Sequence, residues 1–109
     1  MPLFMWQAAY TPESWAVQLK NPQNRVETIG RQACESGGGK LVGAWYCFGE
    51  YDIVIVADMP DNESMAAVCL ALAAGGALKT ATTTVLMSGN QAVSAMKKAS
   101  TVNYKPAGR

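Results

Sequence analysis

The chain has 109 residues, of which 50% are hydrophobic and only 16% are charged, and its net charge is +1. This length fits a single domain, and the low net charge argues against an extended nucleic-acid-binding surface. Histidine is absent, which excludes a Ser-His-acid triad, a histidine base and a histidine-ligated haem or metal within this chain.

The first predicted element is a strand over residues 3–10, a run of mixed apolar and aromatic residues. A helix follows it, because Thr11 can cap the first turn and Pro12 and Glu13 suit the positions after the cap. Asn21-Pro22 repeats this pattern and predicts that a second helix restarts there, with Asn21 as its cap.

The second helix has an apolar stripe at helical spacing and ends at the glycines of residues 37–39. The stripe consists of Val26, Ile29, Ala33 and Cys34. Because these glycines precede a predicted strand, whereas phosphate-binding loops precede a helix, we interpret them as a helix stop.

Two strands are predicted over residues 41–48 and 51–58, and the two residues between them indicate an antiparallel hairpin. In the second strand, residues 53–56 are apolar at every position. A strand with one wet face should alternate, so this strand is expected to be covered on both faces. Helices in a two-layer domain cover one face only, and the other face therefore needs a partner.

A further helix begins near Pro60, with Asp61 as its cap and Glu63 in its first turn. Its core stripe is formed by Met65, Val68, Cys69 and Leu72. Gly75-Gly76 ends it. A strand over residues 79–88 then presents Thr80, Thr82 and Thr84 on one side, and a short helix over residues 90–98 follows.

The order β-α-β-β-α-β predicts an α+β fold of the ferredoxin-like type, a four-stranded antiparallel sheet with both main helices on one face. The bare face is expected to include Trp6 or Met5 and Trp45 or Tyr46. Two such faces would pair into a dimeric α/β barrel that encloses a barrel-like space. The predicted division is a domain over residues 1–96, followed by a basic tail over residues 97–109 with four basic residues and no acid.

The candidate site is the segment Gly49-Glu50-Tyr51-Asp52 at the mouth of the hairpin. Asp52 or Glu50 could act as an acid or base, with Tyr51 as a proton donor. In the alternative interpretation Gly49 and Glu50 only shape the turn, Asp52 binds backbone donors and Tyr51 packs. Trp6 and Trp45 could wall a pocket, and Thr82 and Thr84 could bind a ligand or be ordinary strand residues.

The three cysteines are widely spaced, without a Cys-x-x-Cys pair. We interpret them as reduced, buried thiols of a cytoplasmic protein, with no metal site and no cofactor. The N-terminus lacks the features of a signal peptide. The longest uncharged apolar stretch, residues 64–78, is too short to span a bilayer.

Several motifs in order resemble those of the bacterial GYD-domain proteins over positions 3 to 90. They are Tyr10-Thr11-Pro12-Glu13, Gly49-Glu50-Tyr51-Asp52 leading into residues 53–56, Pro60-Asp61, and residues 80–84. In this chain Glu50 stands between the glycine and the tyrosine. The resemblance implies a ferredoxin-like subunit of the dimeric α/β-barrel type and no established activity.

Two functions are compatible with these observations. The first is a homo-oligomeric module that binds a small apolar molecule or serves in assembly, and it is favoured by the charge-poor composition and the limited catalytic residues. The alternative is a metal- and haem-free enzyme of the monooxygenase or isomerase kind, acting on a small apolar or aromatic substrate in the barrel cavity. In both, the expected partner is a second copy of the chain, with no nucleic acid and no membrane.

Overall fold

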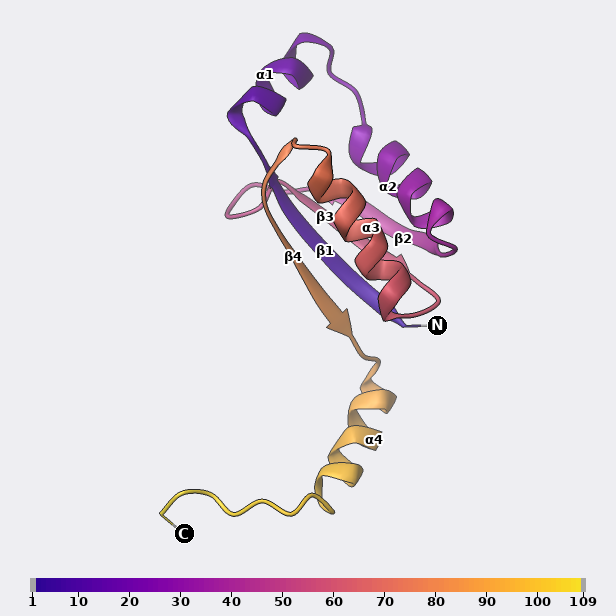
Figure 1. Ribbon diagram of the computed structural model, residues 1–109, viewed down its shortest axis with the longest axis vertical. Helices are drawn as coiled ribbons and strands as arrows, with labels where there is room; N and C mark the ends of the chain where they lie inside the picture. The colour runs from indigo at the N-terminus through magenta and orange to yellow at the C-terminus, as the bar shows by residue number, and fades with distance from the viewer. Residues whose placement is uncertain (1, 109) are drawn as a thin grey trace.

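The computed structural model describes residues 2–108 and shows four strands and four helices in them (Figure 1). In chain order they are β1 (Leu3–Tyr10), α1 (Pro12–Lys20), α2 (Arg25–Ser36), β2 (Lys40–Tyr46), β3 (Ile53–Asp58), α3 (Asn62–Ala74), β4 (Leu78–Leu86) and α4 (Gly89–Ala99). The strands form one sheet in the order β2-β3-β1-β4, and every neighbouring pair is antiparallel. The predicted α+β fold of the ferredoxin-like type is confirmed.

The two central strands present alternate residues to opposite faces of the sheet. On β1, Phe4, Trp6 and Ala8 are buried, and their partners on β3 are Ala57, Ile55 and Ile53. These residues face α2 and α3, which both cover the same side of the sheet (Figure 1). The intervening residues, such as Met5 and its partner Val56, face the other side.

The hydrophobic core lies between the sheet and the two covering helices. α2 buries Val26 and Cys34 of its predicted stripe, and α3 buries Met65 and Val68 of its own. The other members of the two stripes are partly buried, and α2 also buries Gly30, which was not predicted. At Gly30 a Cβ atom would come within 3.0 Å of Ile55 Cδ1. A glycine at this position therefore lets α2 approach the sheet closely.

The second helix begins three residues later than predicted. Asn24, not Asn21, is its N-cap, and the Asn24 side chain accepts a hydrogen bond from the Glu27 backbone N–H at 3.3 Å. Asn21 instead closes α1, where its backbone N–H donates to the Gln18 carbonyl at 3.2 Å. Both asparagines are suited to capping, and the sequence pattern alone favoured the one before proline.

The hairpin between β2 and β3 has a longer connection than predicted, residues 47–52 instead of two residues. The connection is closed by the Cys47 N–H, which donates to the Asp52 carbonyl at 2.8 Å, while the Asp52 N–H donates to Ala8 of β1 at 2.9 Å. The backbone C=O and N–H of Asp52 are therefore both hydrogen-bonded at the point where the chain enters β3.

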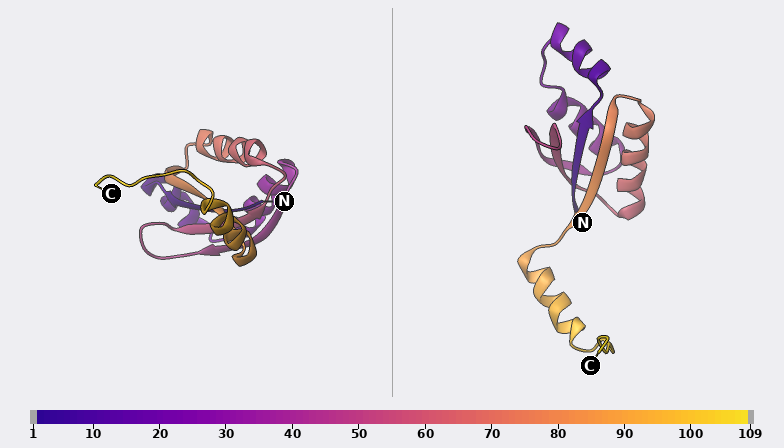
Figure 2. Two further views of the ribbon diagram at one scale, coloured as in Figure 1. Left: turned by 90° about the horizontal axis from the view of Figure 1, so that it is seen from below. Right: turned by 90° about the vertical axis from the view of Figure 1, so that its left-hand side faces the viewer.

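The C-terminal helix α4 projects away from the sheet, and residues 100–108 continue beyond it (Figures 1 and 2). Its start is fixed by a capping box in which the Ser88 hydroxyl accepts from the Gln91 N–H and the Gln91 side chain accepts from the Ser88 N–H. The domain boundary predicted after residue 96 falls inside this helix. None of the helices described in residues 2–108 is long and apolar enough to cross a membrane.

Candidate functional site

Asp52 lies at the junction of β1, β3 and α1 and is engaged in hydrogen bonds. Its Oδ2 accepts from the Tyr10 backbone N–H at 2.9 Å and from the Trp15 indole N–H at 3.2 Å. The Tyr10 and Trp15 rings meet edge to face, with centroids 5.2 Å apart. One carboxylate oxygen thus connects α1 to the end of β1. This agrees with the interpretation that Asp52 accepts hydrogen bonds from backbone donors.

Tyr51 has a different hydrogen-bond partner, on β4. Its hydroxyl lies 2.7 Å from Thr82 Oγ1 on β4, and Thr82 pairs with Gln7, which faces away from the helices. Glu50 is exposed. The Asp52 carboxylate and the Tyr51 hydroxyl therefore bond to different residues and not to one another, whereas the base and the donor of one site act on the same group.

The face of the sheet opposite the helices is defined here as the open face. The strand register places apolar and uncharged polar side chains over most of it. Its residues are Leu3, Met5, Gln7, Ala9, Gly43, Trp45, Val54, Val56, Thr80, Thr82, Thr84 and Leu86, together with Lys40 and Asp58, which are charged and lie at the end of the face beside Leu3. Thr84 lies opposite Met5, and Trp45 lies opposite Val54.

Trp45 is the largest side chain of the open face and is 54% exposed. A Cβ atom at Gly43 would collide with the Trp45 ring, so the ring lies directly over that glycine. Of the two residues predicted as alternatives for the bare face, Trp45 and Tyr46, the register places Trp45 there, paired with Val54.

Trp6 does not belong to the open face, so its predicted role as a wall between paired sheets is wrong. It is 3% exposed and packs with Ile55 under the helices. The physical reason is the strand period of two residues, which places Met5 and Trp6 on opposite faces. Tyr46 likewise pairs with Ile53 on the helix side.

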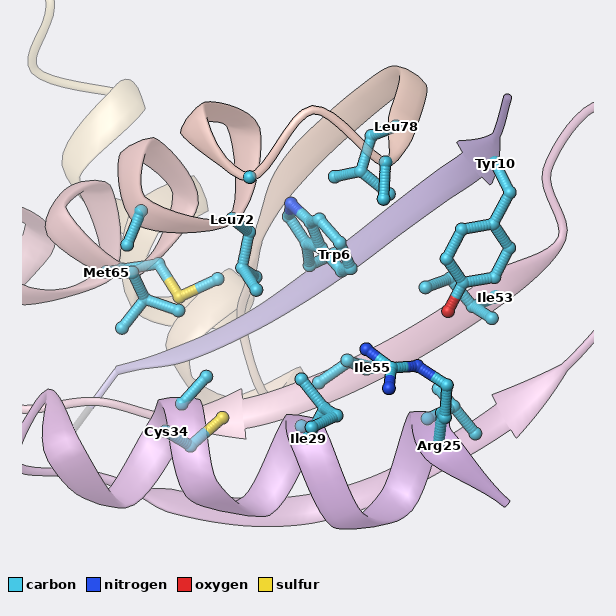
Figure 3. Close-up of a pocket in the computed structure, with 17 residues that line it drawn as sticks. Trp6, Tyr10, Arg25, Ile29, Cys34, Ile53, Ile55, Met65, Leu72 and Leu78 are labelled. Atoms are coloured by element: carbon cyan, nitrogen blue, oxygen red, sulfur yellow. The ribbon is translucent and has the colours of Figure 1, made fainter. Parts of the chain in front are cut away.

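A cavity that the sequence did not reveal lies between α2, α3 and the helix-covered face of the sheet (Figure 3). Its volume is about 230 Å³. Trp6 and Ile55 form its floor, Ile29 and Cys34 line it from α2, and Leu72 lines it from α3. Apolar stripes on two helices are typical of a closed core, so nothing in the pattern distinguished a gap from a packed interface.

The described part of the chain, residues 2–108, contains no cluster of three or more side chains suited to hold a metal ion. All three cysteines are free, with Cys34 buried and Cys47 and Cys69 half-buried. The Cys47 thiol lies 3.1 Å from the Tyr51 carbonyl, and the Cys69 thiol lies 3.2 Å from Thr83 Oγ1.

This arrangement defines a ferredoxin-like α+β domain with one apolar sheet face left open. Residues 4–96 match the GYD domain family, and the chain belongs to that family. The predicted resemblance is thereby confirmed over nearly all of the sheet and its helices.

Two comparisons place the chain among known proteins. It is 29% identical over 82 residues to the glutamine synthetase and cystathionine beta-lyase binding protein of Thermus thermophilus, covering 75% of this chain and 85% of that protein. The crystal structure of MtbAldR matches with a TM-score of 0.61 at 13% identity, over 80% of this chain. The chain spans about half, 52%, of the MtbAldR chain. At this identity the likeness concerns the fold alone.

Proposed function

We propose that this protein is a non-catalytic assembly module. Its open face pairs with the open face of a second copy, and the resulting dimer binds other proteins. The observation that supports pairing most directly is the apolar character of the open face, which no helix of residues 2–108 covers (Figure 1).

The side chains of the open face fit self-association better than contact with water. Leu3 and Trp45 are 36% and 54% exposed. The polar residues in the middle of the face are a glutamine and threonines, which carry no charge, while Asp58 and Lys40 lie at the end of the face beside Leu3. Two copies related by a twofold axis can therefore meet without like charges at the centre of the interface. Burial of Leu, Val, Met and Trp side chains would stabilise the pair at roughly 25 cal/mol per Å² of apolar surface.

Binding of other proteins is supported by the relative and by the exposed aromatic residues of this chain. The Thermus thermophilus relative is described as a binding protein for glutamine synthetase and cystathionine beta-lyase. In this chain Phe48, in the connection between β2 and β3, is fully exposed. An exposed aromatic side chain on a loop is typical of a protein contact, because aromatic residues are enriched at interfaces. We extend the relative's partners, both metabolic enzymes, to this protein as part of the proposal.

The geometry gives the enzyme alternative no comparable support. Asp52 Oδ2 already accepts two hydrogen bonds near the helices, whereas the Tyr51 hydroxyl bonds Thr82 on the open face. The carboxylate and the hydroxyl are thus engaged by different residues of the chain and are not bonded as a pair around one substrate atom. We therefore do not propose catalysis by this segment.

The pairing is tested by measuring molar mass with light scattering and native mass spectrometry. Val56 lies in β3 between Met5 and Gly43 on the open face, so Val56→Lys should place a charge in the interface and yield a folded monomer. Val85→Lys is the matched control, because Val85 pairs with Phe4 on the opposite face and is already 60% exposed. It should keep the parent's mass.

The pairing would be contradicted if the parent is a monomer at every concentration over a 100-fold range. It would also be contradicted if the Val56→Lys variant has the parent's mass.

Protein binding is tested separately by surface plasmon resonance against glutamine synthetase and cystathionine beta-lyase from the same organism. Phe48→Ala should weaken whichever binding is seen, and absence of binding to both enzymes would contradict that part of the proposal.

A further inference from the structure

The cavity between α2, α3 and the sheet is apolar along most of its wall but has a polar end. Arg25, the first residue of α2, and Tyr10, the last residue of β1, lie at this end (Figure 3). Figure 3 shows the Arg25 guanidinium reaching over the cavity and the Tyr10 hydroxyl directed toward the same end. The rest of the lining is formed mainly by aliphatic, aromatic and sulfur-containing side chains.

Both polar groups are free to bind a ligand within the part of the chain that the structure describes. In residues 2–108 the one ion pair joins Arg31 to Glu27 at 3.3 Å, and neither the Arg25 guanidinium nor the Tyr10 hydroxyl makes a hydrogen bond. Arg25 does bond through its backbone, whose N–H donates to the Tyr46 hydroxyl at 3.2 Å. This bond fixes the start of α2 and leaves the guanidinium available.

No acidic residue of the described chain lines the cavity. Asp52 does not line the cavity, and its Oδ2 is held by the Tyr10 and Trp15 N–H groups. Burial raises the pKa of Tyr10 above its usual value of 10.0, with smaller contributions from Tyr46 and Asp52, while the Arg25 charge acts in the opposite direction. Tyr10 therefore keeps its proton at neutral pH and can donate a hydrogen bond.

We propose that this cavity binds a small monocarboxylic acid with an apolar body, whose carboxylate is held by Arg25 and Tyr10. A guanidinium and a hydroxyl together suit a carboxylate, because arginine offers several N–H donors in a plane and the hydroxyl adds another. The apolar body would lie between Trp6, Ile29 and Leu72.

The volume limits the ligand to a small molecule. An apolar cavity of roughly 150 Å³ in another protein accepts benzene, so about 230 Å³ suits a phenyl ring with a short side chain or a short aliphatic chain. The site lies on the helix side of the sheet, opposite the open face, and thus goes beyond the proposed pairing.

The proposal is tested by titrating the full chain with 3-phenylpropionate and hexanoate, and with the amide of each, by calorimetry and ¹H–¹⁵N NMR. The acids should bind, shift the Trp6 indole N–H signal, and bind at least tenfold more tightly than the amides. Arg25→Gln should reduce the affinity for the acids at least tenfold and leave the amides unaffected. Arg31→Gln removes the same charge from the same helix outside the cavity and should change neither.

Two further variants separate the polar end from the apolar body. Tyr10→Phe should weaken binding of the acids by a smaller factor than Arg25→Gln, and Ala33→Leu should fill the cavity and abolish binding of acids and amides together. If no acid binds, if acids and amides bind equally, or if Arg25→Gln retains the parent's affinity, the proposal is overturned. Should Ala33→Leu fail to fold, the acid–amide and Arg25–Arg31 comparisons still decide the question.

Discussion

The role of Asp52 in holding β1 to α1 gives a prediction with a calculable size. Asp52→Ala removes the acceptor of the Tyr10 N–H and the Trp15 indole N–H. A hydrogen bond to a charged group contributes about 1.5–3 kcal/mol. Asp52 is partly accessible to water and the Trp15 bond is long, so we take the lower end for each and expect a loss of about 3 kcal/mol. For a domain of this size that corresponds to a melting temperature lowered by roughly 10–20 °C.

Thermal unfolding followed by circular dichroism measures this loss. Asp52→Asn keeps an oxygen acceptor without the charge and should cost about 1 kcal/mol. Glu50→Ala, two residues earlier and exposed, should change stability by less than about 0.5 kcal/mol. In a double-mutant cycle, Trp15→Phe should cost less in the Asp52→Ala background than in the parent, because the indole bond is then already absent. An Asp52→Ala melting temperature within about 2 °C of the parent's would refute the structural role.

Three further predictions concern single side chains. Gly43→Ala should push the Trp45 ring off the open face and red-shift tryptophan emission, whereas Gly49→Ala, with nothing near its Cβ position, should leave the spectrum unchanged; identical spectra would contradict the packing. Because the pKa of Tyr10 is raised in the folded state, its contribution to stability is fully present below pH 10 and is lost as the pH rises through the folded-state value. The free energy of unfolding, measured by denaturant titration, should therefore fall less steeply above pH 10 in Tyr10→Phe than in the parent, and an equally steep fall would contradict this prediction. Burial raises the pKa of the Cys34 thiol, which is 2% exposed, so alkylation followed by mass spectrometry should modify Cys47 and Cys69 first, and early labelling of Cys34 would be the contrary result.

The local signals of the chain predicted the fold well, because each depends on neighbours in sequence. Thr11 and Asp61 cap α1 and α3 as expected, with bonds to the Ser14 and Ser64 N–H groups at 3.1 and 2.7 Å. The second of these lowers the pKa of Asp61, which is the response of a carboxylate to backbone donors. Residues 53–56 place side chains on both faces, as an unbroken apolar run implies.

The errors concern features that depend on contacts between distant segments. The sequence left Met5 and Trp6 as alternatives for the open face, and the choice is made by the register of β1 against β3 and β4. Asp52 had two interpretations, and its actual partners, Tyr10 and Trp15, lie 42 and 37 residues earlier. The cavity likewise depends on how far α2 and α3 stand apart over Trp6, and apolar spacing within each helix contains no information on that distance.

The alternation along β1 and β3 allows the two proposed surfaces to be tested independently. Val56 faces the open side, and Ile55, one residue earlier, lines the cavity. A charge at Val56 should therefore abolish pairing while acids still bind, whereas Arg25→Gln should weaken acid binding in a molecule that still pairs. If Val56→Lys is a folded monomer that has lost acid binding, the cavity depends on the partner for its shape. The two functions would then be coupled through the sheet, because the same two strands form one wall of each site.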